Sequence, residues 1–534
     1  MEPSLRKRDR STTKTQQEQA QSLSKKSSQI KGFRLKYVIF FLGVLFGAIF
    51  LGTYFLLGAV GIGHDTLSDI LSSQGSFVRG DELSRGRDEL NRGKPDDPIS
   101  ADVKPVQKQS SALSLPTIVW WTDKLFPHFQ GKNTVKIECE PSQGGQGTCL
   151  VTTDKSVLSD PLARGVMFYG SDFRAYEAPL PRLPWHEWAV IHEESPLNNQ
   201  IFSHAVMMSQ FNHTSTFRRE SHYPITTQHI KSLDYLTERQ PVPISMKNKH
   251  RETLAPIAYI QTHCNVPSDR DRYVKELMKY IDVDSYGKCV NNKKLPENLQ
   301  DPVESMDAKE FYDFIARYKF HLAFENGICE DYITEKLIRP FHVGCVPIYR
   351  GSPSVRDWIP DNHSIILVDN FQSPKELAEF IKRLDKNDKE YLKYLEFKNK
   401  GISNQLLRHT VERRVWGVND WRKPSFINAF ECYLCERIVE RVEAERAHER
   451  DPSIPLLPPR VADGNHAGCP EPSVSLGDMS GVGRGEDIHF WKEDYWSSKD
   501  QALALKRMSE QGATDSSKLF EELQRMFTEG ALSK

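Results

Sequence analysis

The stretch FHLAFENGICEDYITEKLIRPFHVGCVPIYRG, residues 320–351, decides the fold of the second half of this 534-residue chain. Its apolar start predicts a buried strand that ends at Glu325 and Asn326. A short turn then leads into a helix that we expect to begin near Asp331. Gly344 predicts the end of that helix, and the apolar run after it predicts the next strand. Strand, helix and strand in this order are typical of a parallel α/β sheet.

The amino-terminal end of that helix is a candidate nucleotide site. Free backbone N–H groups and the positive end of the helix dipole suit a phosphate. Lys336 stands about one turn into the helix and adds a full charge, and Glu335 can accept hydrogen bonds from ribose hydroxyls. The alternative is an ordinary strand–helix–strand unit in which both residues are solvated surface charges.

Two series of alternating strands and helices predict two lobes. The apolar runs TIVWW, GVMFY and WAVI, from Thr117 on, are typical of buried parallel strands, and a second series begins near Ala255 with APIAYIQT. The pattern predicts an α/β protein with two doubly wound, Rossmann-like lobes and a ligand site in the cleft between them. We assign residues 116–254 to the first lobe, 255–436 to the second and 437–534 to a C-terminal extension.

The amino-terminal region predicts a membrane anchor. Residues 37–63 carry no charge, and a helix of this length crosses a hydrocarbon core of roughly 30 Å. A cleavable signal peptide is the competing interpretation, but its apolar part is nearer 7–15 residues, roughly. Residues 1–36 are strongly basic, so the positive-inside rule leaves them in the cytosol and the chain beyond residue 63 in a lumen. Residues 64–115 are charged, without apolar periodicity, and read as a stem.

Composition adds little about function. The chain has 71 basic and 72 acidic side chains, so no overall field favours nucleic acid. Nine cysteines are few for a disulfide scaffold. A luminal location permits disulfides and makes Asn212 and Asn362, each in an Asn-x-Ser/Thr sequence, usable glycosylation acceptors.

The stretch 320–351 resembles the nucleotide-sugar motif of the α1,3-fucosyltransferase family, which reads roughly FEN-S-x-x-x-DY-[IV]-TEK. Residues 324–326 and 331–336 match it, and Gly327 departs from the commoner serine. The resemblance covers much of residues 117–436, including SDRDRYVKELMKYIDVDSYGKC. It implies the two-lobed GT-B fold, a GDP-fucose donor and inversion at the sugar.

The resemblance also implies roles for particular side chains. Five of them would bind the donor: Arg270, Asn326, Tyr332, Glu335 and Lys336. Arg270 and Lys336 would neutralise the diphosphate, and Glu335 would hold the ribose. The planar fork of an arginine can pair two phosphate oxygens. Arg272, two residues further on, is the alternative cation.

The catalytic base is expected in the first lobe. In WAVIHEESPLNN an apolar strand runs into Glu193 and Glu194, and the ESP triplet resembles the family's acceptor-lobe motif. Inverting transfer needs a base that takes the proton of the acceptor hydroxyl. We assign it to Glu194, with Glu193 as the rival. FNHTSTFRRES resembles another family segment and points to Arg218 and Arg219 lining the cleft.

A metal site is considered because Asp282 and Asp284 form a DxD pair, which holds a divalent ion in many transferases of the other major fold. Cations and a helix end can neutralise the diphosphate without an ion. We therefore expect Asp284 to be structural and the reaction to need no metal and no other cofactor. Activity lost with EDTA would favour the metal-dependent alternative.

The cysteine pattern leaves several pairings open. Cys432 and Cys435 form a CxxC, but no second CxxC or His pair stands at metal spacing. The family resemblance implies that Cys139 and Cys149 pair with these two. Four more cysteines could supply a further bridge: Cys264, Cys289, Cys329 and Cys345.

Wording such as HEESPLNN and SSKDQALALKRM resembles a divergent branch of the family. That resemblance implies transfer of fucose to Ser or Thr of small cysteine-rich EMI domains, by an enzyme anchored as a type II protein in the endoplasmic reticulum membrane. The alternatives are α1,3-fucosylation of GlcNAc on N-glycans, a Golgi location, and an inactive membrane-tethered lectin or chaperone.

Overall fold

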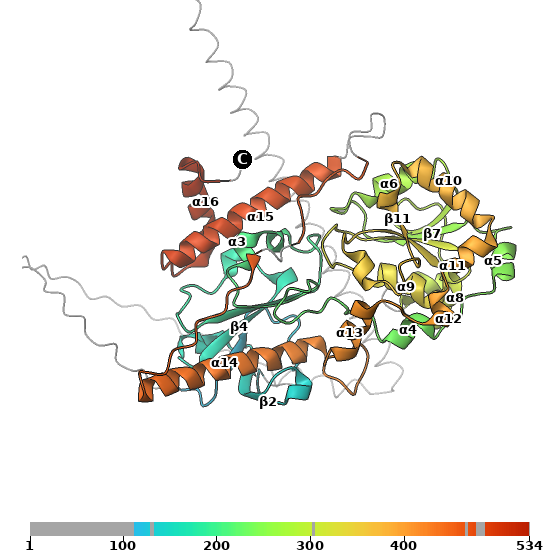
Figure 1. Cartoon of the computed structure of the whole chain (residues 1–534). Helices are drawn as coiled ribbons and strands as arrows, with labels where there is room; N and C mark the ends of the chain where they lie inside the picture. The colour runs from blue at the N-terminus through green and yellow to red at the C-terminus, as the bar shows by residue number, and fades with distance from the viewer. Residues whose placement is uncertain (1–111, 129–132, 302–304, 465–467, 477–485, 533–534) are drawn as a thin grey trace, which may run out of the picture. The chain divides into compact units, whose positions relative to one another are not determined.

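The computed structural model describes residues 112–128, 133–301, 305–464, 468–476 and 486–532 (Figure 1). The predicted cytosolic tail, the membrane anchor at 37–63 and nearly all of the stem lie outside these residues. Within the described residues, no helix combines the length and apolarity that crossing a membrane requires.

The first lobe is built on a six-stranded sheet with the order β2-β3-β1-β4-β5-β6. All neighbouring strands run parallel except β2 and β3. The strands are β1 Thr117–Trp120, β2 Thr134–Cys139, β3 Gly147–Thr152, β4 Ala163–Tyr169, β5 Glu187–His192 and β6 His213–Thr216. Strands β4 and β5 are buried along their whole length, as the continuous apolar runs predicted.

The second lobe is built on a parallel five-stranded sheet with the order β11-β10-β9-β7-β8. Its strands are β7 Ile257–Gln261, β8 Val283–Gly287, β9 Phe320–Phe324, β10 Val346–Arg350 and β11 Ile366–Leu367. The helices of this part are α4 Leu233–Thr237, α5 Ile244–His250, α6 Arg270–Leu277, α8 Lys309–Ile315, α9 Glu335–Val343, α10 Pro374–Asp385, α11 Asp388–Lys393, α12 Phe397–Lys400 and α13 Gln405–Arg413. The two predicted α/β lobes are confirmed.

Helix α9 begins later than predicted. Asp331 has φ of 61°, in the left-handed region, so the helix cannot start there. Thr334 is the N-cap, and its hydroxyl accepts a hydrogen bond from the backbone N–H of Lys336. Gly344 ends the helix with φ of 70°, as predicted.

The lobe boundaries differ from the prediction at two places. Tyr235 and Leu236 of α4 lie in the hydrophobic core of the second lobe, so this lobe begins before residue 255. Helix α14, Phe426–Arg450, supplies Phe430 and Leu434 to the core of the first lobe. The chain thus returns to the first lobe before residue 436, and Figure 1 shows α14 along the β4 region.

The C-terminal extension completes the first lobe. Helix α15, Glu486–Glu510, contributes Leu505 and Met508 to an apolar cluster that also contains Trp188 of β5. The amide of Asn212 donates to the carbonyl oxygen of Arg460 at 2.7 Å. Helix α16, Leu519–Thr528, adds Leu519 and Met526 to the same cluster. The extension is therefore part of the folded first lobe.

Four disulfides are present. Cys139–Cys432 and Cys149–Cys435 join β2 and β3 to α14, which confirms the pairing implied by the family resemblance. Cys264 pairs with Cys289; both belong to the four cysteines whose pairing the sequence did not predict. Cys329 pairs with Cys469 of the extension, a residue that the sequence reasoning did not consider, and Cys345 is buried outside any disulfide.

Candidate active site

The end of β5 places two adjacent carboxylates at the edge of the first sheet. Glu194 lines a cavity together with Pro196, Phe217 and Cys469 among others. The hydroxyl of Tyr332, from the second lobe, donates to Glu194 Oε2 at 3.4 Å. The predicted base and a residue of the predicted donor motif therefore meet across the two lobes.

The surroundings of Glu194 favour a basic carboxylate. Burial raises its pKa above the ordinary value of 4.5. The positive charge of Lys336 opposes this shift, and the negative charge of Glu335 adds to it. A carboxylate with a raised pKa accepts a proton more readily than a solvated one, which suits a general base.

Glu193 is the less accessible member of the pair. Burial raises its pKa to about 7, although Tyr169, which donates to Glu193 Oε1 at 3.0 Å, works against the shift. Its second oxygen, Oε2, is buried without a hydrogen-bond partner in the described part of the chain. Because Glu194 lines the cavity and Glu193 does not line it, the geometry favours Glu194 as the base.

A small charged network stands at the amino-terminal end of α9. Glu325 is fully buried and accepts from the backbone N–H and the hydroxyl of Thr334, at 2.8 and 2.7 Å. Burial raises the pKa of Glu325 to about 7. Lys336 Nζ lies 3.1 Å from Glu335 and 3.9 Å from Glu325. The lysine is therefore held close to the helix end, where a phosphate would approach.

Burial would raise the pKa of Glu335, but the charges of Lys336, His229 and Arg339 outweigh it and lower that pKa strongly. Glu335 is thus held as an ionised acceptor, the form that a ribose-binding carboxylate needs. Its side chain remains 28% exposed, so a ligand can reach it.

Asn326 and Gly327 lie where the two lobes approach each other. Asn326 is buried, and its Oδ1 has no hydrogen-bond partner among the residues described. A Cβ at Gly327 would lie 3.2 Å from Cβ of Ser195 and 3.3 Å from Cδ of Pro196. The glycine that departs from the family's serine therefore lets the loop after Glu194 pack closely on the donor motif.

The two cations predicted near α6 are already engaged. Arg270 is 1% exposed and donates to the carbonyl oxygens of Phe324 and His263, each at 2.9 Å. Arg272 lies 3.8 Å from the carboxylate of Asp269. Arg270 thus braces the end of β9, and its role toward a diphosphate stays a prediction.

Arg219 joins the first lobe to the second. Its guanidinium donates to both oxygens of the buried Asp331, which belongs to the donor motif, and it also pairs with Asp357 at 2.8 Å. The guanidinium lies over the ring of Trp358. Arg218 lines the cavity beside Glu194 and pairs with Glu220 at 2.9 Å. Both arginines therefore lie at the lobe junction, and their roles toward a substrate stay predictions.

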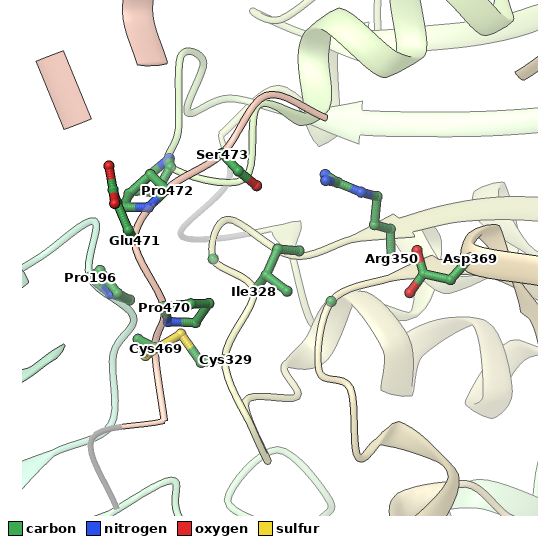
Figure 2. Close-up of a pocket in the computed structure, with 13 residues that line it drawn as sticks. Pro196, Ile328, Cys329, Arg350, Asp369, Cys469, Pro470, Glu471, Pro472 and Ser473 are labelled. Atoms are coloured by element: carbon green, nitrogen blue, oxygen red, sulfur yellow. A yellow bond between two sulfur atoms is a disulfide. The ribbon is translucent and has the colours of Figure 1, made fainter. Parts of the chain in front are cut away.

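A second cavity lies at the carboxyl ends of the second-lobe strands (Figure 2). Its walls include Ile328 after β9, Arg350 at the end of β10 and Asp369 after β11. The segment 469–473 of the extension passes across it, with Pro196 of the first lobe on the other side of that segment. From the sequence, no role was assigned to Arg350, which stands near the end of the stretch 320–351 but beyond its matched positions, and none to the segment 469–473.

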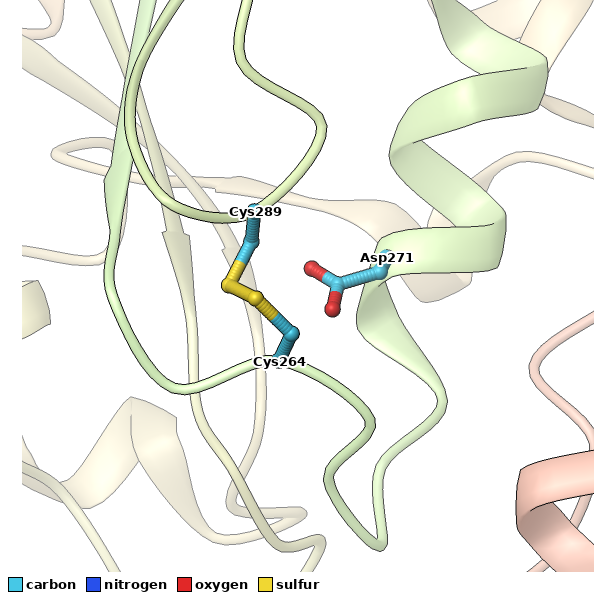
Figure 3. Close-up of side chains that lie close together, drawn as sticks. All are labelled: Cys264, Asp271 and Cys289. Atoms are coloured by element: carbon cyan, nitrogen blue, oxygen red, sulfur yellow. A yellow bond between two sulfur atoms is a disulfide. The ribbon is translucent and has the colours of Figure 1, made fainter. Parts of the chain in front are cut away.

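Two clusters among the described residues were candidates for a metal site, one acidic and one containing cysteines. Asp284 is buried, accepts from Tyr318 and the backbone N–H of Ala255, and pairs with Lys293 at 2.8 Å, so its carboxylate is occupied by protein donors. Cys264, Asp271 and Cys289 lie close together, but Figure 3 shows the two sulfurs joined in a disulfide. Those sulfurs are thus unavailable as thiolate ligands.

The two predicted glycosylation acceptors differ in accessibility. The amide nitrogen of Asn212 is buried against Arg460, and its oxygen accepts from the backbone N–H of Trp188 at 2.8 Å. The prediction that Asn212 is a glycosylation acceptor is therefore wrong for the folded chain, because its amide is buried and hydrogen-bonded. Asn362 is exposed and stays a candidate.

Comparisons with known proteins bear on both lobes. The family descriptions "Fucosyltransferase, N-terminal" and "Glycosyltransferase family 10 (fucosyltransferase) C-term" match residues 114–227 and 246–450. The GDP-fucose protein O-fucosyltransferase 3 of Danio rerio is 45% identical over 402 residues, which cover 74% of this chain and 83% of the relative. The protein of the same name from Gallus gallus is 42% identical over 426 residues, covering 78% and 86%.

A solved α1,3-fucosyltransferase structure with GDP-fucose is also similar. It is 16% identical with a TM-score of 0.34, and the match covers 62% of this chain and 93% of that one.

Proposed function

Since the chain belongs to the fucosyltransferases of glycosyltransferase family 10, we propose that it transfers L-fucose from GDP-fucose to Ser or Thr hydroxyls of proteins. The observation that supports this most is the 42–45% identity, across both lobes, to relatives named GDP-fucose protein O-fucosyltransferase 3. Within the branch that the sequence resembles, EMI-type domains are the proposed acceptors.

In this proposal Glu194 removes the proton from the acceptor hydroxyl as the oxygen attacks the anomeric carbon of fucose. The attack comes from the face opposite GDP, so the configuration inverts. The Tyr332 hydroxyl, 3.4 Å from Glu194, holds the carboxylate toward the second lobe. Lys336 and the amino-terminal end of α9 neutralise the charge that GDP gains on leaving. Glu335, Asn326 and Tyr332 position the donor.

We also propose that the reaction needs no metal ion. Lys336 and the helix end supply positive charge where the diphosphate would lie, and the carboxylate of Asp284 is occupied by protein donors. Transfer should persist in EDTA at the rate seen without it. Loss of activity in EDTA that is restored by added Mg²⁺ or Mn²⁺ would contradict this.

The acceptor is tested with the purified full-length protein and GDP-fucose. One reaction contains a folded EMI-type domain and the other a GlcNAc-terminated N-glycan. We expect fucose on Ser or Thr of the domain, located by mass spectrometry of its peptides. Fucose that appears on the glycan alone would replace the proposed acceptor by the N-glycan.

The pH dependence tests the state of the base. Because a raised pKa keeps Glu194 protonated up to a higher pH, kcat/KM should fall as the pH drops through that raised value, by about tenfold per pH unit. The fall should begin above the ordinary carboxyl pKa of 4.5. A kcat/KM that stays constant from pH 7 down to pH 4.5 would contradict an ionised Glu194 base.

We propose that the two lobes face the lumen of the endoplasmic reticulum, on a type II membrane protein anchored by residues 37–63. Four disulfides support an oxidising compartment. Imaging of the full-length chain beside endoplasmic reticulum and Golgi markers separates the two locations, and staining confined to the Golgi would favour the alternative.

A further inference from the structure

The outer wall of the second cavity comes from the C-terminal extension. We define the strap as residues 468–476. It is bound to the second lobe near both ends. Cys469 forms the disulfide with Cys329, and the carbonyl oxygen of Gly468 accepts from the backbone N–H of Glu330 at 2.9 Å. Further along, the backbone N–H and hydroxyl of Ser475 donate to Asp269 Oδ2 at 2.9 and 3.1 Å.

The inner wall of this cavity carries a cation. Arg350 ends β10, and Figure 2 shows its side chain extending toward Ser473 of the strap. One guanidinium nitrogen, Nη1, donates to the carbonyl oxygen of Ser268 at 2.5 Å. Burial lowers the pKa of Arg350, while the nearby charges of Asp369 and Asp269 favour its charged form.

Arg350, like Arg270, donates to a backbone carbonyl oxygen, whereas three other cations of the site face carboxylates. Arg219 is paired with Asp331, Lys336 with Glu335, and Arg272 faces Asp269. Among the described residues, no carboxylate lies within 4.0 Å of the Arg350 guanidinium. A half-buried cation that lacks an ion pair is energetically costly unless an anion can reach it.

We propose that this cavity is an anion subsite in which Arg350 binds a phosphate oxygen of a nucleoside diphosphate and the strap closes the outer side. The location supports a nucleotide, because ligands of doubly wound sheets lie beyond the carboxyl ends of the strands. The neighbouring Ile328 lies in the turn between the two matched parts of the donor motif, residues 324–326 and 331–336. The inference rests on the proposed function in taking the donor nucleotide as the ligand.

The two carboxylates of the cavity fit this assignment. Glu471 of the strap lies 3.6 Å from Lys492 of α15, so its charge is largely balanced. Asp369 lies on the inner wall, where it can accept hydrogen bonds from hydroxyl or amino groups of the nucleotide. The cavity therefore offers one cation for phosphate and acceptors for the uncharged parts.

Calorimetric titration of the full-length protein with GDP and with guanosine tests Arg350. In Arg350→Ala, the affinity for GDP should fall roughly tenfold to hundredfold, the usual loss of a hydrogen bond to a charged group, while the affinity for guanosine stays unchanged. Arg350→Lys keeps the charge and should recover part of the loss. Arg383→Ala, which removes an exposed cation of α10, is the matched control and should bind both ligands normally.

Equal losses for GDP and guanosine, or unchanged GDP binding, would overturn the proposal. If Arg350→Ala does not fold, the affinities of Arg350→Lys for GDP and guanosine are compared in the same way, and we expect a loss for GDP alone. GDP binding is measured without transfer, so a wild-type protein that binds GDP through Arg350 but transfers no fucose would refute the proposed function alone.

The strap is tested by breaking its disulfide. The double variant Cys329→Ser/Cys469→Ser should release GDP several times faster than the wild-type protein, because the outer wall is no longer fixed. Cys264→Ser/Cys289→Ser removes the other disulfide of the second lobe and should leave the release rate unchanged. Equal release rates in the two double variants would exclude a closing role for the strap.

Discussion

Replacing Glu194 by Gln is expected to lower fucose transfer by roughly 100- to 10,000-fold, the range that a general base contributes. Glutamine has nearly the same shape but cannot take the proton of the acceptor hydroxyl. The contact with Tyr332 can persist, because the amide oxygen still accepts from the hydroxyl. The measurement is kcat with saturating GDP-fucose and acceptor, together with the affinity for GDP, which should stay near the wild-type value.

Glu193→Gln is the matched control, since it makes the same chemical change one residue away. The Glu193 carboxylate accepts from Tyr169 and does not line the cavity, so we expect at most a modest loss of kcat. A larger loss in Glu193→Gln than in Glu194→Gln would move the base to Glu193. Similar turnover in both variants and in the wild-type protein would exclude a carboxylate base at this position.

Most of the fold could be predicted from patterns of neighbouring residues in the sequence. Buried parallel strands are continuous apolar runs, and a helix end is marked by Gly344, so the two sheets could be read along the chain. The predicted start of α9 near Asp331 is wrong because Asp331 adopts a left-handed conformation, in which its side chain accepts from Arg219, 112 residues away.

Long-range pairings could not be read in the same way. The return of α14 to the first lobe depends on how Phe430 and Leu434 pack. The apolar face of a helix predicts burial, but it does not predict which of the two sheets the helix covers. Asn212 has the sequence of a glycosylation acceptor, yet its amide is occupied by Arg460, which lies 248 residues away. Family resemblance supplied the chemistry of the motif, and it reached the CPEPSV segment at residues 469–474, but it implied neither the disulfide of Cys469 nor a contact of that segment with the second lobe.

The Arg219–Asp331 pair should be the most important polar contact between the lobes. The Asp331 carboxylate is 1% exposed and accepts hydrogen bonds from five donor atoms: Arg219 N, Nε and Nη2, Ser354 Oγ and Trp358 Nε1. Burial alone would raise the pKa of Asp331, but the hydrogen bonds from Arg219 and the others outweigh it and lower that pKa below 3.8. The carboxylate is therefore ionised at neutral pH.

Replacing Asp331 by Ala should destabilise the folded protein by about 3–5 kcal/mol, because the guanidinium and the other donors lose their buried acceptor. Chemical denaturation measures this loss. Asp357→Ala removes the other carboxylate that pairs with Arg219, but its side chain is 45% exposed, so we expect a loss of no more than about 1 kcal/mol.

The pH dependence of the free energy of unfolding gives a second test of Asp331. A lowered pKa in the folded state means that the stability from Asp331 is present above the unfolded pKa, near 3.8, and is lost as the pH falls through the folded value. The difference in unfolding free energy between wild type and Asp331→Ala should therefore be full at neutral pH and shrink only in strong acid.

Since Tyr332 directly follows Asp331 and reaches Glu194, the Asp331→Ala variant should also lose transfer activity at temperatures where it remains folded. Equal stability losses in the Asp331 and Asp357 variants would mean that the buried carboxylate does not organise the junction between the lobes.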